Sequence, residues 1–243
     1  MVQQLPTDTA QQLIYPDSDG QLMADNTKQF RWIVVIKENL ELLFAANSDV
    51  FVAGDLLWYP VVGDNKTRQA PDAMVVFGRP KGDRGSYKQW EEDNIPPQVV
   101  FEILSPGNRL KGMAHKLKFY ERYGVEEYYI YDPDNPEIIG WQRSGEYFEI
   151  IEEMNDWVSP RLGIRFHPTS ENLEIFSPSG ERFLTYVELA QLMEQERQRA
   201  EQERQRAEQE RQRADEALTQ LEQERQRYQA LEALLRERGI NPE

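Results

Sequence analysis

The chain has 243 residues, of which 39% are hydrophobic, so it is long enough for one domain with a core plus an appendage. Its net charge of −15 argues against non-specific nucleic-acid binding over the whole surface, and the lack of cysteine excludes disulfides and thiolate metal sites. No apolar run approaches 20 residues, so we expect no membrane-spanning helix. The polar N-terminal residues have no basic, apolar leader, which favours the cytoplasm.

Composition divides the chain into three segments. Residues 1–26 are polar with little periodicity, and we expect them to be mostly flexible. Residues 27–190 carry nearly all the aromatic residues and all the strand-like patterns, and we expect them to form the folded domain. Residues 191–243 are highly charged and contain a heptad repeat, EQERQRA, which predicts a long helix.

The middle segment shows both helical and strand patterns in chain order. Apolar spacing predicts one helix over residues 27–46 and a second over residues 113–123, which ends at Gly124. Apolar and alternating runs predict strands within residues 50–60, 71–78, 97–104, 126–133, 137–144, 146–153, 162–168 and 173–178. This order predicts an α/β (α+β) fold with a mixed central sheet, flanking helices and a β-rich periphery.

Glu102 lies in the middle of an apolar strand, where an ionised carboxylate is costly unless it is paired. Asp72 opens the strand before it, so pairing of the two strands would bring both carboxylates to one end of the sheet. Two close carboxylates ionise readily only around a cation, and two oxygen ligands plus waters suit Mg²⁺ or Mn²⁺. The alternative is that Asp72 caps a turn and Glu102 pairs with a core Arg or Lys.

The second predicted helix supplies a lysine. Lys116 shares an inward stripe with Tyr120 and Tyr123, whereas Lys118 is rotated by about 200° and points to solvent. Lys116 could therefore reach the two carboxylates, balance their charge and orient an attacking water. The alternative is a plain structural ion pair with Glu102.

The loop over residues 78–90 is the best candidate for a DNA-binding segment. It joins the two acidic strands and interleaves Tyr87 and Trp90 with the cations Arg79, Lys81, Arg84 and Lys88, which suits phosphate contacts and base stacking. Three acids follow at residues 91–93 and weaken the case, so a solvated loop is the alternative. Arg109 is a further phosphate candidate, and Asp55 could approach the site from a neighbouring strand.

Three stretches, APDAMVVFG, VVFEILSPGNR and KLKFYERYGVEEYYIYDP, together resemble the Uma-type family of restriction endonuclease-like proteins. This family lies in the PD-(D/E)XK nuclease superfamily, and the resemblance covers about residues 27–185. It implies a restriction-endonuclease-like fold and divalent-metal hydrolysis of DNA phosphodiester bonds, with Asp72, Glu102 and Lys116 as catalytic residues. The superfamily lysine lies two residues after the strand acid, where this chain has Leu104, but the Uma-type pattern carries it in the following helix.

The same resemblance leaves some roles and functions open. A helical acid is common in the superfamily, and Glu38 or Glu41 could match it. The chain could be a Mg²⁺-dependent endonuclease, a catalytically degenerate nuclease fold that acts as a scaffold through its tail, or an interaction protein with a structural Glu102 ion pair. Cutting both strands of a duplex would favour a homodimer.

The tail is either a solvated helix or a weak coiled coil with a partner helix. Ala200, Ala207 and Ala214 occupy one heptad position, but the second position is charged, whereas a stable coiled coil has two apolar positions. The distal leucines, from Leu231 to Leu235, are the more adhesive part.

Overall fold

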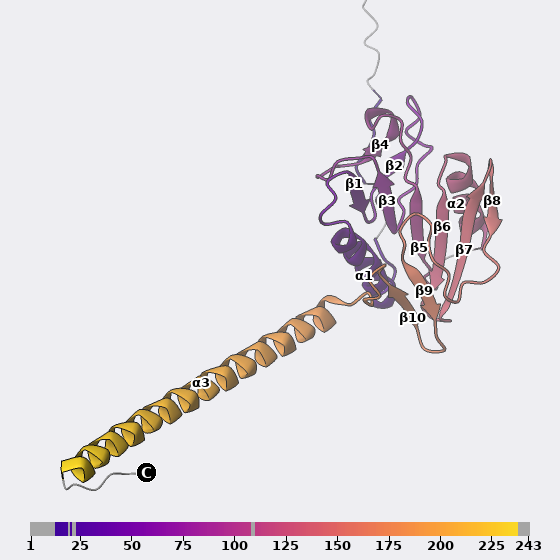
Figure 1. Ribbon diagram of the computed structural model, residues 1–243. Coiled ribbons are helices and arrows are strands. Elements are labelled where there is room, and N and C mark those ends of the chain that lie inside the picture. The colour runs from indigo at the N-terminus through magenta and orange to yellow at the C-terminus, as the bar shows by residue number, and fades with distance from the viewer. Residues whose placement is uncertain (1–12, 19, 21–22, 108–109, 238–243) are drawn as a thin grey trace, which may run out of the picture. The chain divides into compact units, whose positions relative to one another are not determined.

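The computed structural model describes residues 13–18, 20, 23–107 and 110–237 (Figure 1). The chain divides into two compact units, Met1–Thr185 and Tyr186–Glu243. The division coincides with the first residue of the long helix α3, whereas the composition placed it near residue 190. All strands of the described residues lie in the first unit.

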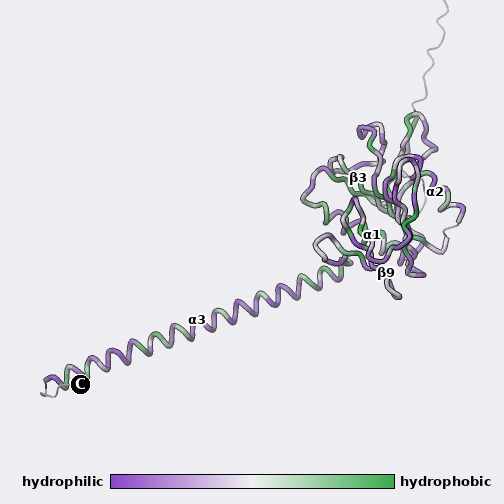
Figure 2. The backbone as a smooth tube through the Cα atoms, turned by 45° about the vertical axis from the view of Figure 1, so that its right-hand side comes forward, coloured by the Kyte–Doolittle hydropathy of each residue, from purple (hydrophilic) through white to green (hydrophobic). Residues whose placement is uncertain are grey.

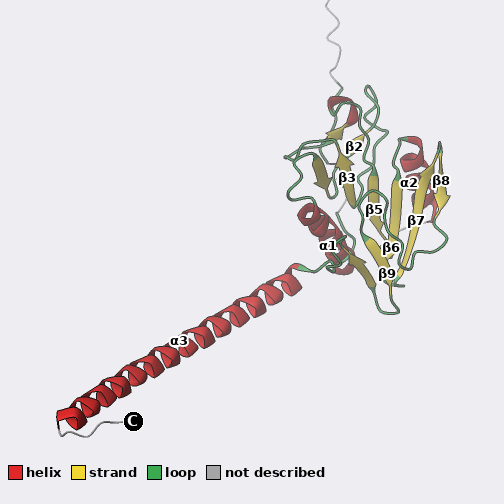
Figure 3. Cartoon of the chain, in the orientation of Figure 1, coloured by secondary structure: helices red, strands yellow, loops and turns green. Residues whose placement is uncertain are grey.

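A six-stranded mixed sheet forms the centre of the first unit (Figure 3). Its strands, in spatial order, are β1 (Val50–Ala53), β3 (Ala73–Phe77), β5 (Val99–Ile103), β6 (Glu127–Asp132), β7 (Glu137–Ser144) and β8 (Tyr147–Ile150). Within this six-stranded sheet, β5 and β6 are parallel, and every other pair of neighbouring strands is antiparallel. Parallel neighbours need a crossover, and α2 (Leu110–Arg122) supplies it. The fold class predicted from the sequence is therefore confirmed.

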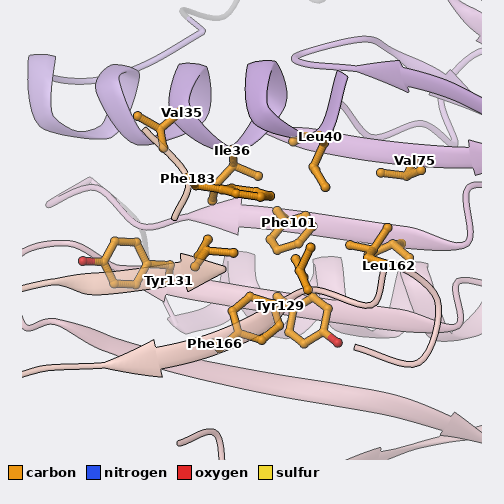
Figure 4. Close-up of a cluster of buried hydrophobic side chains, with 14 of the residues drawn as sticks. Val35, Ile36, Leu40, Val75, Phe101, Tyr129, Tyr131, Leu162, Phe166 and Phe183 are labelled. Carbon is orange, nitrogen blue, oxygen red and sulfur yellow. The ribbon is translucent and has the colours of Figure 1, made fainter. Parts of the chain in front are cut away.

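Two hydrophobic cores lie on opposite faces of this sheet, because β5 and β6 are buried on both sides. On one face, α1 (Thr27–Leu43) packs Ile36 and Leu40 into the core cluster that also holds Phe101 and Tyr129 (Figure 4). The Asn26 side chain caps this helix by accepting from the backbone N–H groups of Lys28 and Gln29. On the other face, α2 packs Tyr120 against the strands, and Gly124, at φ +93°, follows the helix as predicted.

Shorter strands form the β-rich periphery. β9 (Arg165–Pro168) pairs with β10 (Leu173–Phe176) in an antiparallel hairpin. β2 (Trp58–Tyr59) pairs in parallel with β4 (Tyr87–Lys88), which is followed by the short 3₁₀ helix η1 (Gln89–Glu91). The sequence predicted one strand or a kinked pair over residues 50–60, and the structure has the pair, two strands separated by a bend. β4 lies in what the sequence indicated as a loop.

Part of the N-terminal segment contacts the domain. The Tyr15 ring packs against Tyr59 and Trp90, with centroids 5.2 and 4.9 Å apart, and the Tyr59 hydroxyl donates to the Pro16 carbonyl at 2.7 Å. Residues 13–18 thus lie against the domain, because packing against Tyr59 and Trp90 removes the apolar surface of the Tyr15 ring from water. The remaining flexibility prediction for residues 1–12, 19 and 21–22 lies outside the described residues.

The second unit is the single helix α3 (Tyr186–Glu237), whose 52 residues include none that is buried. Hydrophilic residues dominate it, with hydrophobic ones between them (Figure 2). Glu194–Arg197 and Glu196–Arg199 form ion pairs three residues apart, both at 2.9 Å. Such pairs each stabilise a helix by roughly 0.2–0.5 kcal/mol. None of the helices in the described part of the chain is long and apolar enough to cross a membrane.

Candidate active site

The pairing of β3 with β5 sets Asp72 across from Glu102. Ala73 is paired with Phe101 in antiparallel register, so the next residue back on β3 meets the next residue forward on β5. The Ile103 backbone N–H then donates to Asp72 Oδ2 at 2.6 Å. Both carboxylates are buried, with 8% of Asp72 and 2% of Glu102 exposed. The two acids predicted from the sequence therefore lie at the same end of the same strand pair.

Lys116 and Tyr120 compensate the buried charge of Glu102. The Lys116 ammonium donates to Glu102 Oε2 at 2.6 Å, and the Tyr120 hydroxyl donates to Oε1 at 2.5 Å. Both side chains come from α2 and are four residues apart, so they project from the same face of the helix. Each carboxylate oxygen of Glu102 thus has a donor, which explains how this residue is buried within an apolar strand.

Tyr120 is a site residue for which the sequence predicted no role. Its ring is fully buried and stacks on Trp58, with ring centroids 6.3 Å apart and ring planes at 4° to each other. The ring centroid of Tyr128 lies 4.9 Å away. This packing fixes the direction of the hydroxyl toward Glu102. Its position four residues after Lys116, on the inward stripe, is the signal that could have identified it.

The charges of the site shift the pKa values of its groups. Burial, and then repulsion by Glu102, raise the pKa of the Asp72 carboxyl well above its usual value, and Lys116 opposes the rise. Burial lowers the pKa of Lys116, but attraction to Glu102 and Asp72 together raises it by more. The pKa is therefore above its ordinary value and the ammonium stays charged. Burial and Glu102 also raise the pKa of Tyr120, which keeps its hydroxyl protonated as a donor.

Asp55 is a third acid near the site, in agreement with the expectation that it could approach from a neighbouring strand. It follows β1 and has φ +50°, a left-handed conformation that is uncommon for residues other than glycine and that occurs at functional sites. Its backbone N–H donates to the Pro71 carbonyl at 3.0 Å, so it lies beside the segment that leads into Asp72. Its charge further raises the pKa values of Asp72 and Lys116.

The carboxylates of Asp72 and Glu102 suit a cation that keeps most of its waters better than one enclosed by protein ligands. Within residues 13–18, 20, 23–107 and 110–237, no three His, Cys, Asp or Glu side chains converge into a group able to hold a metal ion. Mg²⁺ keeps several waters and is usually held by one or two carboxylates together with substrate phosphates. Asp72 and Glu102 are such a pair, and their mutual repulsion is what a divalent cation would offset.

The predicted helical acids do not join this site. Glu38 is exposed and pairs with Lys37 at 3.0 Å, and the half-buried Glu41 pairs with Lys81 at 2.9 Å. Their helix, α1, packs on the opposite face of the sheet from α2, which delivers Lys116. Neither acid is among the groups that shift the pKa values of Asp72 and Lys116 most.

The cations of the predicted DNA-binding loop are bound to acids. Glu92 accepts from Arg79 at 2.9 Å and from Arg84 at 2.6 Å, and Asp93 also pairs with Arg79. Lys81 pairs with Glu41, and Lys88 lies 3.5 Å from Glu91. The acids that follow the loop turn back onto it and neutralise it, so the loop is a poor phosphate-binding segment. Arg109 lies outside the described residues.

The fold and these side chains define an α+β protein with a buried acidic site at one end of a mixed sheet. A family model described as "Uma2: Putative restriction endonuclease" matches residues 2–167, more than half of the sequence. The chain therefore belongs to this restriction endonuclease-like nuclease family, which confirms the resemblance seen in the sequence.

Comparison with solved structures found a chain described as "a putative nuclease belonging to DUF820 from Anabaena variabilis ATCC 29413". It is 16% identical, with a TM-score of 0.42, and the match covers 56% of this chain and 72% of that one. No curated protein matches the chain.

Proposed function

We propose that this chain is a Mg²⁺- or Mn²⁺-dependent endonuclease that hydrolyses phosphodiester bonds in DNA. The observation that supports this most is the convergence of Asp72, Glu102 and Lys116 at one end of the sheet, in a member of a nuclease family. Asp72 and Glu102 would hold the cation. A bound divalent ion lowers the pKa of water and neutralises the charge that develops on a phosphate.

Tyr120 and Lys116 have distinct roles in the proposed reaction. Tyr120 holds Glu102 through Oε1, which fixes the direction of the other carboxylate oxygen. Lys116 balances the charge of the two acids before substrate binds, and it can then turn its ammonium toward a phosphate oxygen or the attacking water. In the reaction, the water oxygen bonds to phosphorus, one P–O ester bond breaks, water loses a proton, and the departing oxygen gains one.

A second candidate is a catalytically degenerate nuclease fold that acts as a binding or scaffold module through its helical tail. The observation that favours it is that both oxygens of Glu102 already have protein donors, as a structural ion pair requires. Leu104 also stands where the superfamily places its lysine. The two candidates differ in what happens to the Glu102–Lys116 ion pair. In a nuclease, binding of metal and DNA would rearrange it, whereas in a scaffold module it would stay as it is.

A cleavage assay distinguishes them. Purified protein is incubated with plasmid DNA in Mg²⁺, in Mn²⁺ and in EDTA, and cutting is expected only with metal. Asp72→Ala, Glu102→Ala and Lys116→Ala should each slow cutting by at least about 100-fold, because each removes preorganised charge from the reacting phosphate. Circular dichroism verifies that each variant is folded.

Two variants are matched controls. Glu127→Gln alters another buried carboxylate, on the neighbouring strand, and Lys66→Ala removes an exposed lysine; both should cut at the wild-type rate. Normal cutting by Lys116→Ala would refute its assignment. A wild-type chain that cuts no DNA with either metal would favour the degenerate module.

A further inference from the structure

About half of the lysines and arginines in the described part of the first unit already have acidic partners. Besides the loop cations described above, the paired residues are Lys28 with Asp134, Lys37 with Glu38, Arg161 with Glu126, and Arg165 with Asp156. An acidic protein that binds a polyanion needs a local surface where cations are not neutralised in this way. Such a surface must therefore be sought among the remaining basic residues.

The outer side of α2 carries an unusual set of them. Lys111, His115, Lys118 and Arg122 are spaced four, three and four residues apart, so they form one stripe along the helix, and all four are exposed. In the described part of the chain none of them forms an ion pair; Arg122 lies 5.5 Å from the Tyr123 ring centroid. The one acid of the helix, Glu121, accepts from the Phe148 backbone N–H at 2.8 Å.

This α2 basic stripe lies on the same helix as the catalytic lysine. Lys116 and Tyr120 project from the opposite side of α2 and bond to Glu102. An α-helix is about 10–12 Å across, so the stripe lies roughly one helix diameter from the site. Its length, from Lys111 to Arg122, is about 16 Å at 1.5 Å per residue. Duplex DNA carries one charge per about 1.7 Å of its axis with both strands counted, so a stretch of this length holds about ten phosphates, of which only those on one side can face the helix.

The surroundings of the stripe fit nucleic acid and not a lipid surface. A helix that binds a membrane presents large apolar side chains beside its cations. Among the described side chains of α2, no large hydrophobic one is strongly exposed. The neighbours Gly112 and Ala114 are small, and a Cβ added at Gly112 would meet open space, so a rigid backbone of phosphates can approach closely.

We propose that the α2 basic stripe binds the phosphate backbone of duplex DNA beside the cleavage site. This inference rests on the proposed nuclease function and assigns its substrate-binding surface. Lys111, Lys118 and Arg122 contact phosphates as cations, and His115 donates a hydrogen bond to one. The contacts are to the backbone, so they hold the duplex against α2 independently of its sequence. One helix thus binds the substrate on its outer face and delivers Lys116 on its inner face.

The test compares two full-length variants with the same loss of charge. The first replaces the stripe: Lys111→Gln, Lys118→Gln and Arg122→Gln. The control replaces three exposed cations elsewhere: Arg31→Gln, Lys66→Gln and Arg213→Gln. Glutamine is a good helix former, so both should fold, which a melting curve verifies. Binding to a fluorescent 30-base-pair duplex of mixed sequence is measured by anisotropy in EDTA from 50 to 200 mM salt, and cleavage of it in Mg²⁺.

We expect the stripe variant to bind on the order of 10- to 100-fold more weakly at 50 mM salt. Its log–log salt slope should be smaller in magnitude by about 2.7, because three phosphate contacts are lost at about 0.9 each. The control should change both quantities little. In cleavage, the stripe variant should raise KM and leave kcat near its wild-type value, because backbone contacts stabilise ground state and transition state equally.

Other outcomes would overturn the inference in distinguishable ways. If the wild type cuts DNA and the stripe variant behaves like the control, the surface is wrong and the proposed function stands. The same anisotropy measurement is made with a fluorescent single-stranded RNA of 30 nucleotides; if the stripe variant loses affinity for this RNA and not for the duplex, the duplex assignment is wrong. If the wild type neither binds nor cuts the duplex, the proposed function and the inference fail together.

Discussion

Glu102 and Glu127 are both buried carboxylates, and they lie on the neighbouring parallel strands β5 and β6. Glu127 is on the α1 face of the sheet and is bonded only to neutral donors: the Tyr129 hydroxyl at 3.0 Å, the Arg161 backbone N–H at 2.7 Å, and the Ser159 hydroxyl. Glu102 is on the α2 face, where a cation and a second carboxylate accompany it.

The comparison teaches what a buried acid needs for structure alone. Three neutral donors are enough to hold Glu127, although burial still raises the pKa of its carboxyl. At Glu102, the fold adds Asp72, which increases repulsion, and Lys116, a cation that costs free energy to desolvate. Glu127 shows that a glutamate can be buried in this sheet without either, so the arrangement at Glu102 favours the catalytic candidate over the structural ion pair.

The largest expected effect on stability is that of Lys116→Met. It leaves the Glu102 charge with only the Tyr120 hydroxyl, and breaking a buried pair in this way destabilises a protein by roughly 3 kcal/mol. Urea unfolding at pH 7 measures the loss. Adding Glu102→Gln should restore most of it, because the stranded charge is then gone; a double variant as unstable as Lys116→Met would show that the lysine acts through packing.

A smaller effect is expected at the other carboxylate. Ser159→Ala removes one of the donors of Glu127 and should cost about 2 kcal/mol. The loss should be greater at pH 8 than at pH 4, because the hydroxyl stabilises the ionised form and lowers the pKa of Glu127. Chemical denaturation at both pH values gives the comparison, and equal losses would contradict the role of the ionised carboxylate.

Asp72→Asn should increase stability slightly, by about 1 kcal/mol at pH 7. The pKa of Asp72 is raised in the folded state, so that state binds more protons than the unfolded chain, and wild-type stability falls as pH rises from about 3.8 through the folded pKa. The gain should therefore vanish below pH 4. Melting temperatures of both chains between pH 4 and pH 7 test this gain in stability. Added Mg²⁺ should raise the melting temperature of the wild type only. A large loss would indicate instead that the bond to Ile103 needs a carboxylate.

Truncation after Met193 should have the smallest effect on the domain. Every residue of the two hydrophobic cores lies before residue 184, so the melting temperature should change little. We propose a homodimer, to which the alanine positions of the tail contribute little and the distal leucines more, because Leu231 and Leu234 expose 55% and 54% of their surface. Sedimentation of both chains decides this, and an identical oligomeric state would remove the tail from assembly.

Much of the fold was predictable because its strands are strongly patterned. β5 and β6 are apolar runs bounded by turn residues, and α2 shows a helical stripe that ends before a glycine. β4 could not be predicted, because a strand of two residues has no periodicity and forms only through its pairing with β2. α1 ends at Leu43, three residues before the expected end, because residues 44–46 form turns with backbone bonds three residues apart, from Ala45 N–H to Leu42 and from Asn47 N–H to Phe44.

The site was predictable where local pattern determines position. Helix periodicity, a local rule, predicted that Lys116 lies on the inward face of its helix, whereas the approach of Asp72 to Glu102 was predicted only on the condition that their strands pair. The hydrogen bond from Tyr120 and the neutralised loop required the folded structure. Glu41 reaches Lys81 from a distant helix, and Glu92 returns to Arg84 only because η1 turns the chain back.

The three copies of EQERQRA in α3, from Glu194 to Ala214, are identical in every residue. Gain or loss of one copy changes the helix length by about 10 Å and turns its far end by only about 20°, because seven residues are almost two full turns. Any other small insertion would rotate Leu221 and the leucines beyond it away from the line of Ala200 and Ala207. A change by whole copies therefore alters the length of the helix while its sides keep their alignment.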